Sequence, residues 1–145
     1  MKIVVRLLKV VGVLGVIFLL MQLVPYGREY RNPPATREPA WDSPRTRELA
    51  KRACFDCHSN ETTWPSYSKI APFSWVVYRD VKIAREVVNF SEWDKPYAVG
   101  IYAGQSVKDG SMPPGKYTVA HPEARLTPEE KEALWRGLDK TLDRP

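Results

Sequence analysis

The feature that most constrains this chain is a group of three chemically active side chains within five residues: Cys54, Cys57 and His58. Their pattern, C-x-x-C-H, is typical of covalent attachment of a c-type haem. Two thiols three positions apart on a helical turn can each add to one of two vinyl groups on the same porphyrin edge. The histidine that follows then lies beneath the macrocycle, with a nitrogen directed at the iron. We expect one covalent haem c, attached through Cys54 and Cys57, with His58 as an axial ligand of its iron.

Three other uses of a cysteine pair compete with this interpretation. A redox disulfide of the thioredoxin type belongs in a βαβ context, which this sequence does not show. A closed zinc site needs four ligands, and the chain offers only Cys54, Cys57, His58 and His121, two of which are adjacent in sequence. A structural disulfide would close too small a loop to constrain the chain. The pattern therefore favours haem attachment.

Residues 1–24 form a membrane-targeting segment. They contain Lys2, Arg6 and Lys9, no acidic residue, and an otherwise apolar sequence. As a helix, residues 3–24 would be about 33 Å long, enough to cross the hydrocarbon core. A cleaved signal peptide ends in small residues, yet the first alanine of the chain is Ala35. We expect an uncleaved single-pass anchor in the inner membrane, with a cleaved signal peptide as the alternative. Either would place the cysteines on the periplasmic side.

The net charge of +5 arises mostly from the membrane-targeting segment, so it says little about binding partners. Three of the 22 basic residues lie within residues 1–24, so the rest of the chain carries 19 basic against 17 acidic residues, a net charge of +2. A nucleic-acid interpretation therefore loses its support. The partners we expect are the membrane, contacted through residues 1–24, and redox partner proteins.

Residues 25–44 have the composition of a tether that precedes a folded domain over residues 45–145. Prolines break any helix there, and charges of both signs lie between them. These prolines are Pro25, Pro33, Pro34, Pro39 and Pro44. Such a stretch would hold the domain clear of the membrane surface. Trp41 is the exception, because a lone tryptophan in a tether often folds back onto the domain.

Capping residues mark two helices of the domain. Ser43 can cap a helix that continues through residues 45–55, so that its C-terminal end carries the cysteines. Thr127 can cap the last helix, in which Glu130 completes a capping box. Their apolar faces are formed by Leu49, Ala50, Ala53 and Cys54 in the first helix, and by Ala133, Leu134, Leu138 and Leu142 in the last.

The middle of the domain is predicted to be helical as well. Apolar residues surround much of a helix expected over residues 72–88, which should therefore be largely buried. A shorter helix is expected over residues 94–105. Residues 109–115 hold two glycines and two prolines and are expected to form an extended loop. No segment alternates with the period of a strand, so the domain is predicted to be all-α.

Several further motifs accompany C-x-x-C-H, and together they resemble the bacterial haem-binding domain family of small membrane-targeted proteins. The residues that carry this resemblance are 54–62, 64–68, 70–75, 89–93, 112–114, Tyr117, His121, Pro122, Leu126 and Thr127. The likeness covers roughly residues 45–140, and its order of parts is that of a class I cytochrome c. It implies a c-type haem on a cytochrome c-like helical fold.

The sixth ligand of the iron would decide the chemistry of such a haem. Met112 is the candidate, since the prolines that follow it could hold its thioether towards the iron. A His/Met pair raises the reduction potential and leaves no open position. His121 is the alternative ligand, and a bis-histidine iron would have a lower potential.

Aromatic side chains are abundant enough to wrap a porphyrin and exclude water. Those expected to pack around the haem are Trp64, Tyr67, Trp75, Trp93, Tyr97, Tyr102 and Tyr117.

The function expected from these residues is one-electron transfer rather than enzymatic catalysis. The alternative is a haem-based sensor or a peroxidase-like enzyme with an open or labile sixth position, in which His121 and Arg125 could act on the distal side.

Overall fold

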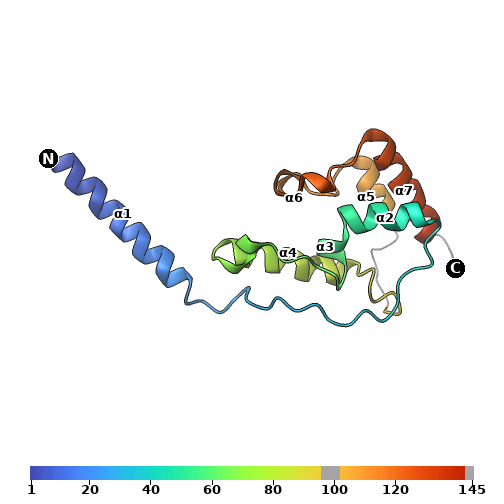
Figure 1. The fold of residues 1–145 in the computed structure, drawn as a ribbon, viewed down its shortest axis with the longest axis horizontal. Helices are drawn as coiled ribbons and strands as arrows, with labels where there is room; N and C mark the ends of the chain where they lie inside the picture. The colour runs from blue at the N-terminus through green and yellow to red at the C-terminus, as the bar shows by residue number, and fades with distance from the viewer. Residues whose placement is uncertain (96–101, 143–145) are drawn as a thin grey trace. The chain divides into compact units, whose positions relative to one another are not determined.

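The computed structural model of the chain describes residues 1–95 and 102–142. Within these ranges the only pairing of the β type is an isolated bridge between Arg37 and Glu92, and all other regular structure is helical (Figure 1). The all-α prediction is therefore confirmed. The chain divides into a first unit, residues 1–31 and 64–80, and a second unit, residues 32–63 and 81–145. Each is described by itself.

The first unit begins with the apolar helix α1, Lys2–Met21, at the blue end of the ribbon (Figure 1). None of its 20 residues is buried in the protein, and its length and hydropathy are those of a candidate membrane span. Gln22 ends the helix in right-handed helical geometry. A core helix of a soluble protein would bury a face, so the exposure of α1 fits a segment whose solvent is lipid.

The chain that follows α1 packs against the other part of the first unit, which contains η1, Ser66–Lys69, and the start of α4, Phe73–Val87. Tyr26 contacts Tyr78 edge to face, with ring centroids 5.3 Å apart. The Tyr30 hydroxyl donates to the carbonyl of Ser68 at 2.9 Å. Residues 25–31 are thus free of helix, as their composition predicts, but they are fixed by specific contacts.

Gly27 allows the closest of these approaches. Its φ of +76° lies in the left-handed region, where a side chain is strained. A Cβ added there would lie 2.7 Å from the carbonyl oxygen of Ser74. The residue is buried, so only glycine satisfies both the conformation and the space.

The second unit opens with a segment that is also held in place. The backbone N–H of Thr36 donates to Ser91 O at 2.8 Å, and that of Trp93 donates to Arg37 O at 2.9 Å. Trp41 lies with its ring centroid 5.2 Å from that of Phe90 and packs against the core, as expected of a tryptophan in this stretch.

Helix α2, Pro44–Ala53, begins as predicted, because the Ser43 side chain accepts a hydrogen bond from the backbone N–H of Thr46 at 3.2 Å. The helix was expected to continue through Phe55, and this is wrong. Cys54 has φ −126° and ψ −34°, which interrupts the helix, and the single turn α3, Phe55–His58, follows it.

The terminal helix α7, Pro128–Leu142, has the predicted capping box. The backbone N–H of Thr127 donates to Glu130, and that of Glu130 donates to the Thr127 hydroxyl, at 3.0 and 3.2 Å. Helix α5, Ala103–Asp109, and helix α2 both pack on α7. Gly137 lets α2 approach closely, because a Cβ there would lie 2.0 Å from the Thr46 hydroxyl oxygen.

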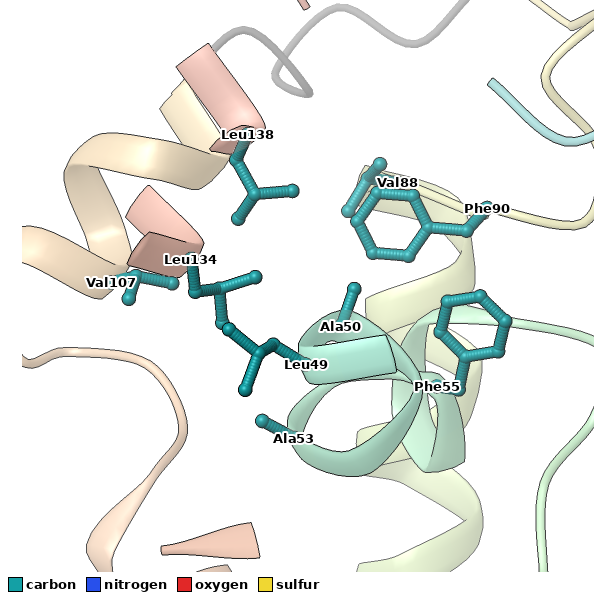
Figure 2. Close-up of a cluster of buried hydrophobic side chains, with 9 residues drawn as sticks. All are labelled: Leu49, Ala50, Ala53, Phe55, Val88, Phe90, Val107, Leu134 and Leu138. Atoms are coloured by element: carbon teal, nitrogen blue, oxygen red, sulfur yellow. The ribbon is translucent and has the colours of Figure 1, made fainter. Parts of the chain in front are cut away.

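The core of the second unit lies between α2, α7 and the chain around Phe90. Figure 2 shows Leu49 of α2 beside Leu134 of α7, and Phe55 beside Phe90. The two phenylalanine rings stack with centroids 5.7 Å apart. The cluster consists of Leu49, Ala50, Ala53, Phe55, Val88, Phe90, Val107, Leu134 and Leu138.

Three expectations about the helices are corrected. Of the helix expected over residues 94–105, residues 94 and 95 are not helical, residues 96–101 lie outside the described residues, and residues 103–105 belong to α5. Gly110 ends α5 in the left-handed conformation of a C-cap. The loop expected over residues 109–115 therefore overlaps α5, and α6, Gly115–Ala120, begins at its end. Ala133 is exposed, since the buried face of α7 follows Leu134, Gly137, Leu138 and Thr141.

Helix α4 is not largely buried. Val81 and Val88 are buried, but a second apolar stripe, Phe73, Val76, Ile83 and Val87, is exposed. The apolar residues of α4 occupy more of its circumference than the described residues cover.

Candidate functional site

The cysteine pair lies at the break between α2 and α3. The Cys54 carbonyl accepts the backbone N–H groups of both Cys57 and His58, at 3.1 and 2.9 Å. These two bonds close one helical turn, so residues 54 and 57 are neighbours on its surface. The sequence forms this turn because Phe55, the residue after Cys54, is buried in the core and fixes the direction of the chain.

Neither cysteine is part of a disulfide, and both are partly exposed. Burial, and secondarily the nearby Cys57, raise the pKa of the Cys54 thiol to about 12. A reactive redox pair needs a cysteine whose pKa is lowered. The environment of Cys54 is the opposite of that, which argues against the thioredoxin-like alternative. Among the described residues no group of three or more histidine, cysteine or acidic side chains could hold a metal ion.

His58 is held by two backbone carbonyls. Its Nδ1 lies 3.1 Å from the carbonyl oxygens of both Ala84 and Val88, near the end of α4. Because both partners are acceptors, Nδ1 must carry the proton, and the lone pair of Nε2 is left for another partner. Burial lowers the pKa of His58, which favours the neutral ring that a metal requires. This arrangement is the usual support of a metal-bound histidine.

A buried polar network surrounds the backbone that follows the imidazole. The backbone N–H of Phe90 donates to His58 O at 2.8 Å, and that of Asn60 donates to the Ser91 hydroxyl at 3.0 Å. The side-chain amide of Asn89 donates to Asn60 Oδ1 at 2.8 Å, and its oxygen accepts from the backbone N–H of Ser91 at 3.0 Å. The segments around residues 58–60 and 89–91 are thereby locked together.

Arg85 adds a charged contact to the same region. Its Nε donates to Ser59 O and its Nη2 donates to the Thr62 hydroxyl, both at 2.8 Å. Burial lowers the pKa of Arg85. Its planar guanidinium thus joins α4 to the chain that leaves the C-x-x-C-H turn.

Asp56, between the two cysteines, connects this turn to α6. The hydroxyl of Tyr117 donates to Asp56 Oδ2 at 2.8 Å. Burial first, and then the bond to this carboxylate, raise the pKa of Tyr117, so the hydroxyl keeps its proton. The Tyr117 ring stacks on His121 with centroids 4.4 Å apart, and His121 Nδ1 lies 3.0 Å from Glu123 Oε1.

Met112 lies between α5 and α6. Its backbone N–H donates to Ser106 O at 3.0 Å, which fixes the main chain, and its side chain is 38% exposed. The thioether is therefore available to a partner outside the core.

The aromatic residues expected around a haem fall into different places. Trp93 stacks on Phe90, with ring centroids 6.1 Å apart, and Tyr117 reaches the C-x-x-C-H turn. Trp64, Tyr67 and Trp75 belong to the first unit, and Tyr102 is exposed. Tyr97 lies outside the described residues.

Sequence reasoning missed the roles of Asp56, Asn60, Asn89 and Ser91. The sequence does contain a signal for this network, because small polar residues that can bond the backbone lie directly after His58 and on both sides of Phe90. However, their positions in the sequence do not show that these two segments contact each other.

The donor set fits a haem. One helical turn presents two thiols outside any disulfide and a neutral imidazole whose Nε2 is available, and these are the groups that a covalently attached haem with a histidine ligand needs. Fold and site together define a helical protein of the haem-binding class.

The sequence pattern of a family described as "Haem-binding domain" matches residues 16–140. The chain belongs to this haem-binding domain family. No curated protein and no solved structure matches it.

Proposed function

We propose that this protein is a membrane-anchored electron carrier with one c-type haem, attached through Cys54 and Cys57 and ligated by His58 and Met112. The observation that carries the proposal is the His58 side chain, whose Nδ1 is bound by two carbonyls in the same turn as two cysteine thiols that form no disulfide. When bound, the haem supplies a one-electron couple between ferric and ferrous iron.

The chain's own residues would hold and orient this group. Cys54 and Cys57 would fix one porphyrin edge, while the Ala84 and Val88 carbonyls set the plane and the tautomer of the imidazole. Outer-sphere electron transfer requires no proton at these groups. What the fold contributes is rigidity, which keeps reorganisation small.

Met112 is the proposed sixth ligand. Its thioether is partly exposed, whereas the His121 ring is stacked on Tyr117 and its Nδ1 meets Glu123. Ligation by His121 would require a ring that already packs on a neighbour to be presented to the iron. A thioether paired with histidine gives a high-potential, closed site.

We place the protein in the inner membrane, with α1 as a single span and the haem on the periplasmic side. The apolar, exposed surface of α1 and the basic residues at its start support this orientation. A net charge of +2 outside residues 1–24 gives little long-range steering, so a redox partner protein would dock through local contacts.

A second function, a sensor or peroxidase-like enzyme with a labile sixth position, is favoured by one observation. The Met112 segment is held by its backbone while the side chain remains 38% exposed. Arg125, which could act on the distal side of such an enzyme, donates instead to Thr118 O at 2.9 Å.

The test is the absorption spectrum of the full chain, matured with a c-type haem apparatus, before and after addition of carbon monoxide. We expect a low-spin ferric spectrum with a methionine-to-iron band and no response to carbon monoxide. Met112→Ala should abolish the band and admit carbon monoxide, whereas His121→Ala, the matched control, should retain it. A high-spin ferric state or ready carbon monoxide binding in the unsubstituted protein would favour the sensor or enzyme instead.

A further inference from the structure

The length of α1 sets the depth at which its C-terminal end lies in a bilayer. The helix has 20 residues, Lys2–Met21, and is therefore about 30 Å long, which equals the thickness of the hydrocarbon core. If α1 is the membrane anchor proposed above, Gln22 must lie at the boundary between the hydrocarbon and the headgroups. Any residue bound to Gln22 lies at the same boundary.

Both the nitrogen and the oxygen of the Gln22 side-chain amide bond the backbone of Ala71. Its Nε2 donates to Ala71 O, and its Oε1 accepts from the Ala71 N–H, each at 3.0 Å. Two residues that follow Gln22 contact the same part of the first unit. Gly27 approaches Ser74 closely, and Tyr30 donates a hydrogen bond to Ser68. Residues 68–74 are therefore fixed to the end of the membrane helix.

The neighbours of Ala71 are large, apolar and exposed. Ile70 is 46% exposed and Phe73 is 60% exposed, and Leu23, next to Gln22, is 75% exposed. Consecutive Cα atoms are about 3.8 Å apart, so Ile70 lies within about 4 Å of Ala71 and Phe73 within about 8 Å along the chain. The interfacial layer on each side of the hydrocarbon core is about 5–7 Å thick. All three side chains are thus within reach of lipid.

We propose that Leu23, Ile70 and Phe73 form a second membrane contact, inserted into the interfacial layer of the bilayer beside α1. The proposal rests on the anchoring of α1. The occupant of this surface is lipid rather than a protein partner, because Gln22 holds these side chains next to the exposed apolar surface of α1. Exposed Lys69 adjoins it and can meet headgroup phosphates. The first unit then rests on the membrane surface instead of being held clear of it.

The test uses single cysteines in the full-length, haem-loaded protein in lipid nanodiscs, which leave both faces open to a charged maleimide. The variants are Ile70→Cys and Phe73→Cys, with Arg79→Cys as an exposed control further along α4 and Leu14→Cys as a control within α1. The unsubstituted chain gives the background of the two native cysteines. Labelling is followed by mass, and the haem spectrum confirms the fold.

We expect Ile70→Cys and Phe73→Cys to react at least about tenfold more slowly than Arg79→Cys, because a low-dielectric layer disfavours the reactive thiolate by a pKa unit or more. Leu14→Cys should be unreactive. Equal rates at positions 70, 73 and 79 with an unreactive position 14 would overturn the second contact and leave the anchor intact. A reactive position 14 would overturn both.

Discussion

In the attachment segment, residues 54–60, the imidazole of His58 meets two carbonyls and the side chain of Asn60 is satisfied within the protein. In the distal segment, residues 111–124, the Met112 side chain is 38% exposed, and the stacked pair Tyr117 and His121 is joined to the attachment segment by a bond to Asp56. Several side-chain hydrogen bonds of the first segment are buried, whereas several of those in the second lie at exposed positions.

This difference shows how stability is distributed around the site. Buried polar groups that are fully hydrogen-bonded hold one arrangement, because breaking one of these bonds leaves its partner unsatisfied and out of reach of water. Exposed backbone contacts open at lower cost. The fold thus holds His58 firmly and leaves the distal segment, which carries the proposed ligand Met112, easier to open.

The largest effect is expected when the two thiols are removed together. Cys54→Ser with Cys57→Ser should abolish covalent haem, because no other cysteine can form a thioether. Cys57→Ser alone should lose one of the two attachments. Denaturing gels stained for haem, with mass spectrometry, measure both. Covalent haem in the double variant would disprove the attachment site.

The next largest effect tests the rigidity of the attachment segment. Asn89→Ala leaves Asn60 Oδ1 and the Ser91 N–H without their partners in a buried place. This should cost about 3 kcal/mol of the free energy of unfolding, measured by urea denaturation.

Gln105→Ala is the matched control, since Gln105 is an exposed amide side chain of α5 and its loss should cost less than about 1 kcal/mol. Equal losses in the two variants would show that the attachment segment is no more tightly specified than the surface.

A smaller effect is expected from the hydrogen bond between Tyr117 and Asp56, which joins the two segments. Tyr117→Phe removes the hydrogen bond to Asp56 and should weaken closure of the distal segment by about 1.4 kcal/mol, or tenfold in an equilibrium constant. Carbon monoxide binding to the ferrous protein should rise accordingly. Tyr102→Phe, at an exposed tyrosine, is the control, and identical binding by the two variants would contradict the role of this bond.

The smallest effect concerns pH. The hydrogen bond from Arg52 holds the pKa of Glu130 at about 2, below its ordinary value of 4.5. Because the folded value is the lower one, the carboxylate stabilises the fold above pH 4.5, and this contribution is lost as the pH falls towards about 2.

Glu130→Gln preserves a capping side chain but carries no charge. In this variant the free energy of unfolding, measured with urea, should fall less steeply as the pH is lowered across that range. Glu132→Gln, at the exposed pair with Arg136, should leave it unchanged. If both variants lose stability with falling pH just as the unsubstituted protein does, Glu130 does not make this contribution.

Local patterns predicted the parts of this fold whose causes are local. Ser43 and the Thr127–Glu130 box cap their helices as expected, because caps depend on residues within one turn. The spacing of Leu134 and Leu138 identified the buried face of α7. The C-x-x-C-H turn was likewise evident, since its chemistry lies within five residues.

What could not be predicted depends on contacts distant in sequence. The carbonyls that hold His58 belong to residues 84 and 88, and the partner of Asp56 is Tyr117. The exposed stripe of α4 was expected to be buried, because periodicity reports that residues are apolar and not whether anything covers them. The Gly110 cap, by contrast, was a local signal that was overlooked.

Glu130 has a consequence for the order in which the protein folds. This residue of α7 ion-pairs with Arg45 and Arg52 of α2, while Leu134 and Leu138 complete the core around Leu49. The helix that leads into the cysteine turn is thus secured by a helix far along the chain. The turn therefore reaches its final form only after α7 has packed on α2, so the site forms late in folding.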